Sequence, residues 1–154
     1  MKAVYQRVTE ASVTVGEKQI ACIGDGVLLL VGVCDGDTEQ EAQVLAKKVA
    51  ELRVFCDDND KMNLSVLDIG GSVLAVSQFT LCANTARGRR PDFFGAAKPD
   101  VAQPLFDYFV NCLRDMGISD VQTGEFGADM QVRLLNDGPV TILLDTDTWK
   151  RSGK

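Results

Sequence analysis

Val27-Leu28-Leu29-Leu30-Val31-Gly32-Val33 is an almost continuous apolar run near the start of the chain. A strand with one solvated face alternates apolar and polar residues, and this run does not alternate. Runs of this length and composition are typical of strands that are buried on both faces. The sequence therefore predicts a central strand over Val27–Val33.

Shorter segments around this run also have the composition of strands. Ala3–Val8 and Ser12–Val15 are rich in β-branched residues, and Gln19–Ile23 follows a Gly16-Glu17-Lys18 turn. A further strand is expected over Ser72–Ser77, after a pair of glycines.

Two helices are expected between and after these strands. Thr38-Glu39-Gln40-Glu41 fits a capping box, and apolar residues then recur at helical spacing, which predicts a helix over about residues 39–53. A second helix can be capped by Asp100 or Gln103, with Pro104 in its first turn.

The last two expected strands are Met130–Leu135 and Val140–Asp145, with Asn136-Asp137-Gly138-Pro139 between them. Asp-Gly between apolar runs is a strong hairpin signal. Pro139 complicates a simple turn, because proline cannot donate a ladder hydrogen bond. On composition alone a trans Gly-Pro bond is favoured, since cis is the minor isomer in folded proteins.

The order of these elements predicts an α/β protein with a single domain over residues 1–145. Its β structure is expected to be mostly antiparallel, as two packed sheets or a barrel-like arrangement, with the two main helices over one face. Residues 146–154 are polar and are expected to form a flexible C-terminal tail.

Composition excludes several classes of function. The net charge of -6 argues against a broad surface for nucleic acid, although it leaves room for a local basic patch. The five cysteines form no CxxC pair, which favours reduced thiols in a cytosolic protein. No apolar run is long enough to cross a membrane, and no signal peptide precedes the first strand.

The chain contains no histidine. That removes the commonest general base, the Ser-His and Cys-His nucleophiles and most zinc sites. Any enzymatic reaction must therefore proceed without imidazole. The sequence also contains no convincing metal site.

Two segments could carry chemistry. The first is Ser77-Gln78-Phe79-Thr80-Leu81, which ends a strand and opens a long loop. It is either a polar strand terminus or a ligand site. Thr80 could act as a nucleophile only with a nearby base, and the sequence supplies no obvious one. Arg87-Gly88-Arg89-Arg90, with Lys98 nearby, is either a solvated loop or a contact for phosphates.

Taken together, blocks along the chain resemble the D-aminoacyl-tRNA deacylase family. Ser77–Leu81 matches the family's SQFTL signature, and Asn136–Thr141 matches its NxGPVT signature. The resemblance runs from Met1 to about Leu144. The other matching blocks are Gln6–Val8, Ala11–Val15, Lys61–Leu64, Arg87–Pro91 and Phe126–Met130.

The resemblance implies the fold of this family and a cytoplasmic homodimer that acts on tRNA without a cofactor. The substrate would be the ester that joins a D-amino acid, or glycine, to the terminal adenosine of tRNA. The site would lie at the dimer interface. It would be lined by Ser77, Gln78, Phe79 and Thr80 through backbone groups, by Phe126 and Met130 around the adenosine, and by Ala102.

A cis Gly138-Pro139 dipeptide, fixed by Arg7, would reach from one subunit into the other's site and exclude L-amino acids. The ribose 2′-hydroxyl would assist hydrolysis, with the N–H groups of Phe79 and Thr80 stabilising the oxyanion. Arg87, Arg89 and Arg90 would contact tRNA phosphates.

Three alternatives stay open at this point. Thr80 could act as a covalent nucleophile on the same substrate. The chain could be a small-molecule esterase that uses Thr80, or an RNA-binding module without catalytic activity.

Overall fold

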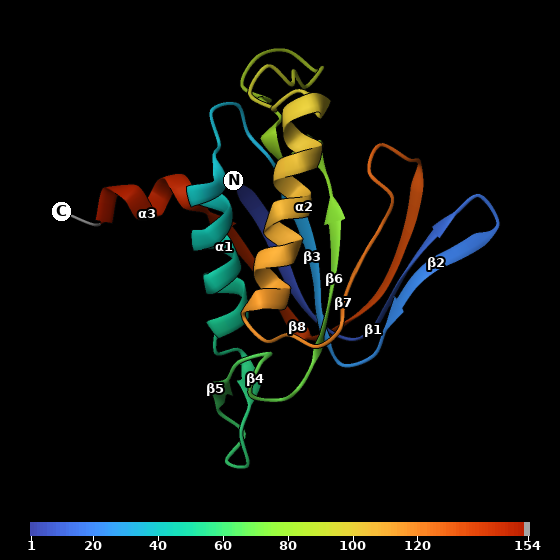
Figure 1. Cartoon of the computed structure of the whole chain (residues 1–154), viewed down its shortest axis with the longest axis vertical. Coiled ribbons are helices and arrows are strands. Elements are labelled where there is room, and N and C mark those ends of the chain that lie inside the picture. The colour runs from blue at the N-terminus through green and yellow to red at the C-terminus, as the bar shows by residue number, and fades with distance from the viewer. Residues whose placement is uncertain (153–154) are drawn as a thin grey trace.

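The predicted central strand is present as β3 (Gly26–Gly32), in a computed structural model that describes residues 1–152 (Figure 1). It lies between β1 (Lys2–Val15), to which it is antiparallel, and β6 (Ser72–Ser77), to which it is parallel. β7 (Val121–Thr123) extends the sheet beyond β6 in parallel orientation. The remaining pairs in the sheet are antiparallel.

β1 is one long strand where two shorter ones were expected. The second half of its length, from Ala11 to Val15, pairs with β2 (Lys18–Ile23), and the first half pairs with β3. Its other edge pairs with β8 (Met130–Asp145) along the whole length. Register shifts between Gln6 and Glu10 mark the place where β1 changes its partner.

The sheet has a separate hydrophobic cluster on each face. Val27, Leu29 and Val31 contribute to the cluster under the helices, whereas Leu28 contributes to the other. This second cluster joins β3 and β6 to the far half of β1, to β2 and to the start of β8, so the sheet curls back on itself and is barrel-like. The prediction that β3 is buried on both faces is confirmed. Burial of each Leu or Val side chain stabilises the folded state by about 1.5–3 kcal/mol relative to leaving it exposed.

The two main helices lie side by side over one face of the sheet, as predicted (Figure 1). α1 (Glu39–Glu51) begins with the expected capping box. The backbone N–H of Gln40 donates to Thr38 Oγ1 at 3.3 Å, and the N–H of Thr38 donates to Glu41 Oε1 at 3.1 Å. A small hairpin of β4 (Phe55–Cys56) and β5 (Met62–Leu64) follows α1.

α2 (Pro99–Asp115) begins earlier than predicted. Its N-cap is Lys98, so neither Asp100 nor Gln103 caps it, and Pro104 lies inside the helix instead of in its first turn. Pro99 explains the difference, because its fixed φ is suited to the first helical position. The first bonds run from the N–H groups of residues 101 and 102 to the carbonyl of Lys98, at 2.9 and 2.8 Å.

The expected hairpin at Asn136–Pro139 is wrong. Met130–Leu135 and Val140–Asp145 belong to the single strand β8, and Asn136–Pro139 forms an irregular segment opposite the register shifts of β1. The hairpin signal failed because β1 supplies a partner for both halves of β8. The two halves therefore do not need to pair with each other.

The expected flexible tail over residues 146–154 is helical where the structure describes it, and residues 153–154 lie outside the described residues. Residues Thr146–Ser152 form α3, and Thr146 is buried. The N-terminal ammonium group of Met1 donates to Thr146 Oγ1 at 2.7 Å and to Asp37 Oδ1 at 2.9 Å. The N–H of Thr146 donates to the carbonyl of Met1 at 3.0 Å. These contacts, from the opposite end of the chain, fix the start of α3.

No helix within residues 1–152 combines the length and hydrophobicity that a membrane crossing requires.

Candidate functional site

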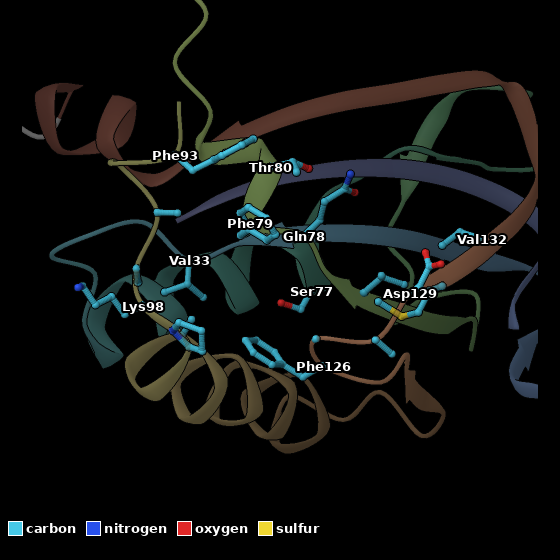
Figure 2. Close-up of a pocket in the computed structure, with 18 residues that line it drawn as sticks. Val33, Ser77, Gln78, Phe79, Thr80, Phe93, Lys98, Phe126, Asp129 and Val132 are labelled. Atoms are coloured by element: carbon cyan, nitrogen blue, oxygen red, sulfur yellow. The ribbon is translucent and has the colours of Figure 1, made fainter. Parts of the chain in front are cut away.

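A cavity of about 690 Å³ opens where β6 ends, and four separate segments form its wall (Figure 2). They are the end of β6 with the turn that follows, the segment from Phe93 into the start of α2, the loop before β8 and the first residues of β8, and Val33 after β3 adds to the wall. The structure brings seven of the expected site residues to this wall. They are Ser77, Gln78, Phe79, Thr80, Ala102, Phe126 and Met130.

The turn after β6 is a 3₁₀ helix, η1 (Phe79–Cys82). The N–H of Gln78 donates to the carbonyl of Val31 at 2.8 Å, which ties the start of the turn to β3. The opening N–H groups of a helical turn have no partner inside the turn. Those of Phe79 and Thr80 are therefore candidates for binding a carbonyl oxygen or an anion.

Gly32 allows β3 to pass close beneath this turn. A Cβ at that position would lie 3.0 Å from Leu81 Cβ and 3.1 Å from the carbonyl oxygen of Gln78. Any other residue at position 32 would push η1 away from the sheet, so the glycine helps to set the depth of the cavity.

Aromatic side chains form much of the apolar surface. Figure 2 shows Phe79 and Phe126 on opposite sides of the cavity, with Ser77 between them. Phe79 is 56% exposed and packs edge-on against Phe93, with the ring centroids 5.1 Å apart. Sequence reasoning missed Phe93, and the only available signal was its place in the long loop after η1.

Within the described residues, no charged side chain of the cavity wall makes a hydrogen bond to Thr80. The charged side chains in the wall are Lys98 and Asp129, and Figure 2 places them at opposite ends of the cavity. Within residues 1–152, Thr80 Oγ1 makes no hydrogen bond to either of them. The same part of the chain contains no cluster of three or more His, Cys, Asp or Glu side chains that could hold a metal ion.

Gly138 and Pro139 lie outside the wall of this cavity, exposed on β8, and the bond between them is cis. Arg7 is only 8% exposed and anchors the segment. Its Nε donates to the carbonyl of Asp137 at 3.1 Å, and its Nη1 donates to the carbonyl of Val54 at 2.6 Å. The segment is thus firmly held but is not used by the cavity of its own chain.

Asn136 is a second anchor, which sequence reasoning noted as part of a turn and of the NxGPVT signature but gave no role of its own. Its Nδ2 donates to the carbonyl of Arg7 at 3.0 Å and to the carbonyl of Val140 at 2.9 Å. Gly138 has a φ of +130°, and a Cβ there would lie 3.0 Å from Arg7 Nη2. Position 138 therefore disfavours a side chain both by its backbone conformation and by the available space.

The three expected tRNA-contacting arginines are Arg87, Arg89 and Arg90. They are exposed on a loop and do not line the cavity. Backbone bonds of 2.9 and 3.0 Å between Asn84 and Asp92 close the base of this loop. Phe93, directly after Asp92, lies in the cavity wall, so the basic loop begins beside the site.

A family model described as D-Tyr-tRNA(Tyr) deacylase matches residues 4–145. The chain belongs to this family. A D-aminoacyl-tRNA deacylase of Roseiflexus castenholzii is 60% identical over 150 residues, which cover 97% of this chain and 95% of that protein. A D-aminoacyl-tRNA deacylase of Geobacter sulfurreducens is 57% identical over 152 residues, 99% of each chain.

A solved structure with the same fold is that of a c-Myc DNA unwinding element binding protein. It has a TM-score of 0.90 and 44% identity, and the match covers 94% of this chain and 98% of that chain. All the site residues expected from the sequence lie inside the region that the family model matches, whereas α3 follows it.

Proposed function

We propose that this protein is a D-aminoacyl-tRNA deacylase. It hydrolyses the ester between a D-amino acid and the terminal adenosine of tRNA, and it releases the free amino acid and the tRNA. Glycyl-tRNA is a further substrate, because glycine has no side chain to exclude. The observation that carries the proposal is the family match over residues 4–145, together with one cavity that gathers seven expected site residues.

The reaction needs little from protein side chains. The ribose 2′-hydroxyl of the substrate lies next to the ester and assists the attack of water on the carbonyl carbon. The N–H groups of Phe79 and Thr80 hold the oxyanion that forms, an interaction worth about 3–4 kcal/mol per donor in comparable sites. Within residues 1–152, no charged side chain of the cavity wall makes a hydrogen bond to Thr80, which supports this route over a threonine nucleophile.

Phe126 and Met130 pack around the adenosine, and Ala102 leaves room for it beside α2. Phe79 and Phe93 add an aromatic surface on the other side. Adenine stacks well on such faces, at about 1–3 kcal/mol per base. The apolar wall thus binds the nucleoside, and the backbone groups of Ser77 and Gln78 orient the aminoacyl part.

A second copy of the chain discriminates between D- and L-aminoacyl groups. Gly138 and Pro139 of one subunit enter the cavity of the other and occupy the space that an L side chain needs, whereas a D side chain points away. Support comes from their exposure, from the anchoring by Arg7, and from their position outside the cavity of their own chain. The working enzyme is therefore a homodimer.

The tRNA body is held by the basic loop, with Arg87, Arg89 and Arg90 on phosphates. Such contacts weaken with added salt. The protein acts in the cytoplasm, where its tRNA substrate is found.

A deacylation assay tests the proposal. D-Tyr-tRNA and Gly-tRNA should be hydrolysed while L-Tyr-tRNA is left intact, and D-Tyr-tRNA that ends in 2′-deoxyadenosine should be resistant. Free D-amino-acid esters hydrolysed as fast as charged tRNA would favour the small-molecule esterase. Binding of tRNA without release of amino acid would favour a module that only binds nucleic acid.

A further inference from the structure

Cys34 and Cys82 bring their sulfur atoms to within 2.7 Å, although 48 positions separate them in the sequence. Cys34 follows β3, and Cys82 is the last residue of η1, the turn that carries Phe79 and Thr80. Neither cysteine lines the cavity. The pair therefore joins two parts of the cavity's support without belonging to the substrate surface.

The two cysteines differ in exposure and in the pKa of their thiols. Cys82 is 6% exposed, and Cys34 is half-buried. The hydrogen bond between the two sulfurs lowers the pKa of the Cys82 thiol, burial opposes this, and the positive charge of Lys2 lowers the pKa further. The contact with Cys82, together with burial, raises the pKa of the Cys34 thiol, so Cys82 is the thiol of the pair that ionises more readily. Asp37, whose Oδ2 accepts from the N–H of Cys34 at 2.6 Å, opposes thiolate formation at both sulfurs.

Two simpler roles fit this arrangement poorly. A metal site needs further ligands, and no cluster of three or more His, Cys, Asp or Glu side chains exists in the described chain. A purely packing role does not require two sulfurs in contact, since alanine or valine fills such space without a reactive group.

We propose that Cys34 and Cys82 are a site of reversible oxidation, at which a peroxide converts the two thiols into an intramolecular disulfide. The Cys82 thiolate attacks one peroxide oxygen, the O–O bond breaks, and the departing hydroxide takes up a proton to become water. The resulting sulfenic acid is attacked by Cys34 sulfur, which forms the S–S bond and releases a second water. Two thiols are oxidised and one hydrogen peroxide is reduced to two waters.

The disulfide strengthens contacts that already surround the cavity. On either side of Cys34, the N–H of Asp35 donates to the carbonyl of Gly95 at 2.8 Å, and the carbonyl of Val33 accepts from the N–H of Ala97 at 3.0 Å. The new bond therefore ties η1 to the end of β3 and to the segment before α2. Because the sulfurs are in contact beforehand and lie outside the lining, the oxidised protein keeps its substrate surface and gains thermal stability.

The test uses the full chain, either reduced with dithiothreitol or treated with a small excess of hydrogen peroxide. Remaining thiols are blocked with iodoacetamide, and peptides are mapped by mass spectrometry. We expect a Cys34–Cys82 cross-linked peptide and three alkylated cysteines of the five. The Tm should rise by roughly 5–10 °C and return to its starting value after reduction.

Cys34→Ser and Cys82→Ala should each abolish the cross-link and the rise in Tm, whereas Cys22→Ser, at an exposed cysteine, should change neither. Deacylation of D-Tyr-tRNA should stay within about twofold of the reduced enzyme. The proposal is overturned if Cys34 and Cys82 are still alkylated after Cys22 and Cys56 have been oxidised. Oxidation of Cys82 to the sulfinic acid without formation of the cross-link would also overturn the proposal. None of these readouts of the disulfide depends on the proposed substrate.

Discussion

Thr80 lies at the start of η1, and within residues 1–152 its hydroxyl makes no hydrogen bond to Lys98 or Asp129, the charged side chains of the cavity wall. The proposal assigns the oxyanion to its backbone N–H instead of its side chain. If the backbone N–H of Thr80, and not its hydroxyl, stabilises the oxyanion, Thr80→Ala should keep deacylation of D-Tyr-tRNA within about threefold of the wild type, because the N–H is retained. Single-turnover rates with D-Tyr-tRNA measure this. A loss of about a thousandfold or more would instead identify the side chain as the nucleophile.

Asn136 holds the exposed Gly138-Pro139 segment by two hydrogen bonds from one amide group. Asn136→Ala removes both and leaves two carbonyls without that donor, so we predict a loss of about 1–3 kcal/mol in the free energy of unfolding. We also predict faster hydrolysis of L-Tyr-tRNA, because the segment proposed to exclude L side chains is no longer fixed.

Urea unfolding and the ratio of D- to L-Tyr-tRNA hydrolysis measure the two effects of Asn136→Ala. Asn63→Ala is the matched control, because the Nδ2 of Asn63 makes only an exposed bond to Asp57. An unchanged D/L ratio in a destabilised Asn136→Ala protein would limit Asn136 to a structural role.

Tyr5 is fully buried, and its hydroxyl has no hydrogen-bond partner within the described residues. Burial raises the pKa of Tyr5 above its usual value of about 10, against the opposing attraction of Arg7. Above pH 10 the unfolded chain therefore loses a proton that the folded chain keeps, and stability falls as the pH rises.

Urea titrations at pH 8 and pH 11 should show this loss in the wild type, at up to about 1.4 kcal/mol per pH unit. Tyr5→Phe should lack that contribution and should be no less stable at pH 8, because it also removes an unpaired buried hydroxyl. The same pH dependence in both proteins would exclude Tyr5 as its source.

At the scale of the elements, α3 depends on Thr146, whose hydroxyl accepts from the N-terminal ammonium group. Thr146→Val keeps the shape but removes this acceptor, so the free energy of unfolding should fall by about 1–3 kcal/mol. The exposed Thr148, which donates to the carbonyl of Asp145 at 2.7 Å, provides the control. Thr148→Val should cost clearly less, and an equal cost would mean that the contact with Met1 contributes little.

The sequence predicted those elements whose signals are local. The apolar run of β3 and the capping box at Thr38 depend on neighbouring residues, and both are present where expected. The hairpin at Asn136–Pro139 failed because the partner of β8 is β1, more than a hundred residues away. The helix at Thr146 was missed for the same reason, since its anchor is Met1.

The residues of the candidate site also fall into those that local motifs predicted and those that depend on distant segments. Motifs singled out Ser77–Thr80 and Phe126, and the structure gathers them in the wall of one cavity, while their role in catalysis stays a prediction. Phe93 and the double hydrogen bond of Asn136 were not found, because each acquires its role only from a segment distant in the sequence.

At the scale of the whole molecule, the proposal requires two chains. One chain provides a cavity, and its Gly138-Pro139 segment lies outside that cavity, exposed and anchored. The exposed apolar residues Leu135 and Leu143 lie on the same strand, which is consistent with a partner covering β8. Chiral discrimination is then a property of the dimer and not of either subunit.

Mixed dimers test this claim most directly. Ala128→Trp should block the cavity and leave β8 intact, and Gly138→Ala should disturb the excluding segment and leave the cavity open. Each homodimer should therefore fail, the first in hydrolysis of D-Tyr-tRNA and the second in rejection of L-Tyr-tRNA. The purified heterodimer has one open cavity faced by an intact Gly138-Pro139, so it should recover about half of the wild-type rate on D-Tyr-tRNA and reject L-Tyr-tRNA fully. A heterodimer that still hydrolyses L-Tyr-tRNA like the Gly138→Ala homodimer would show that each chain judges handedness with its own segment, and would contradict the account.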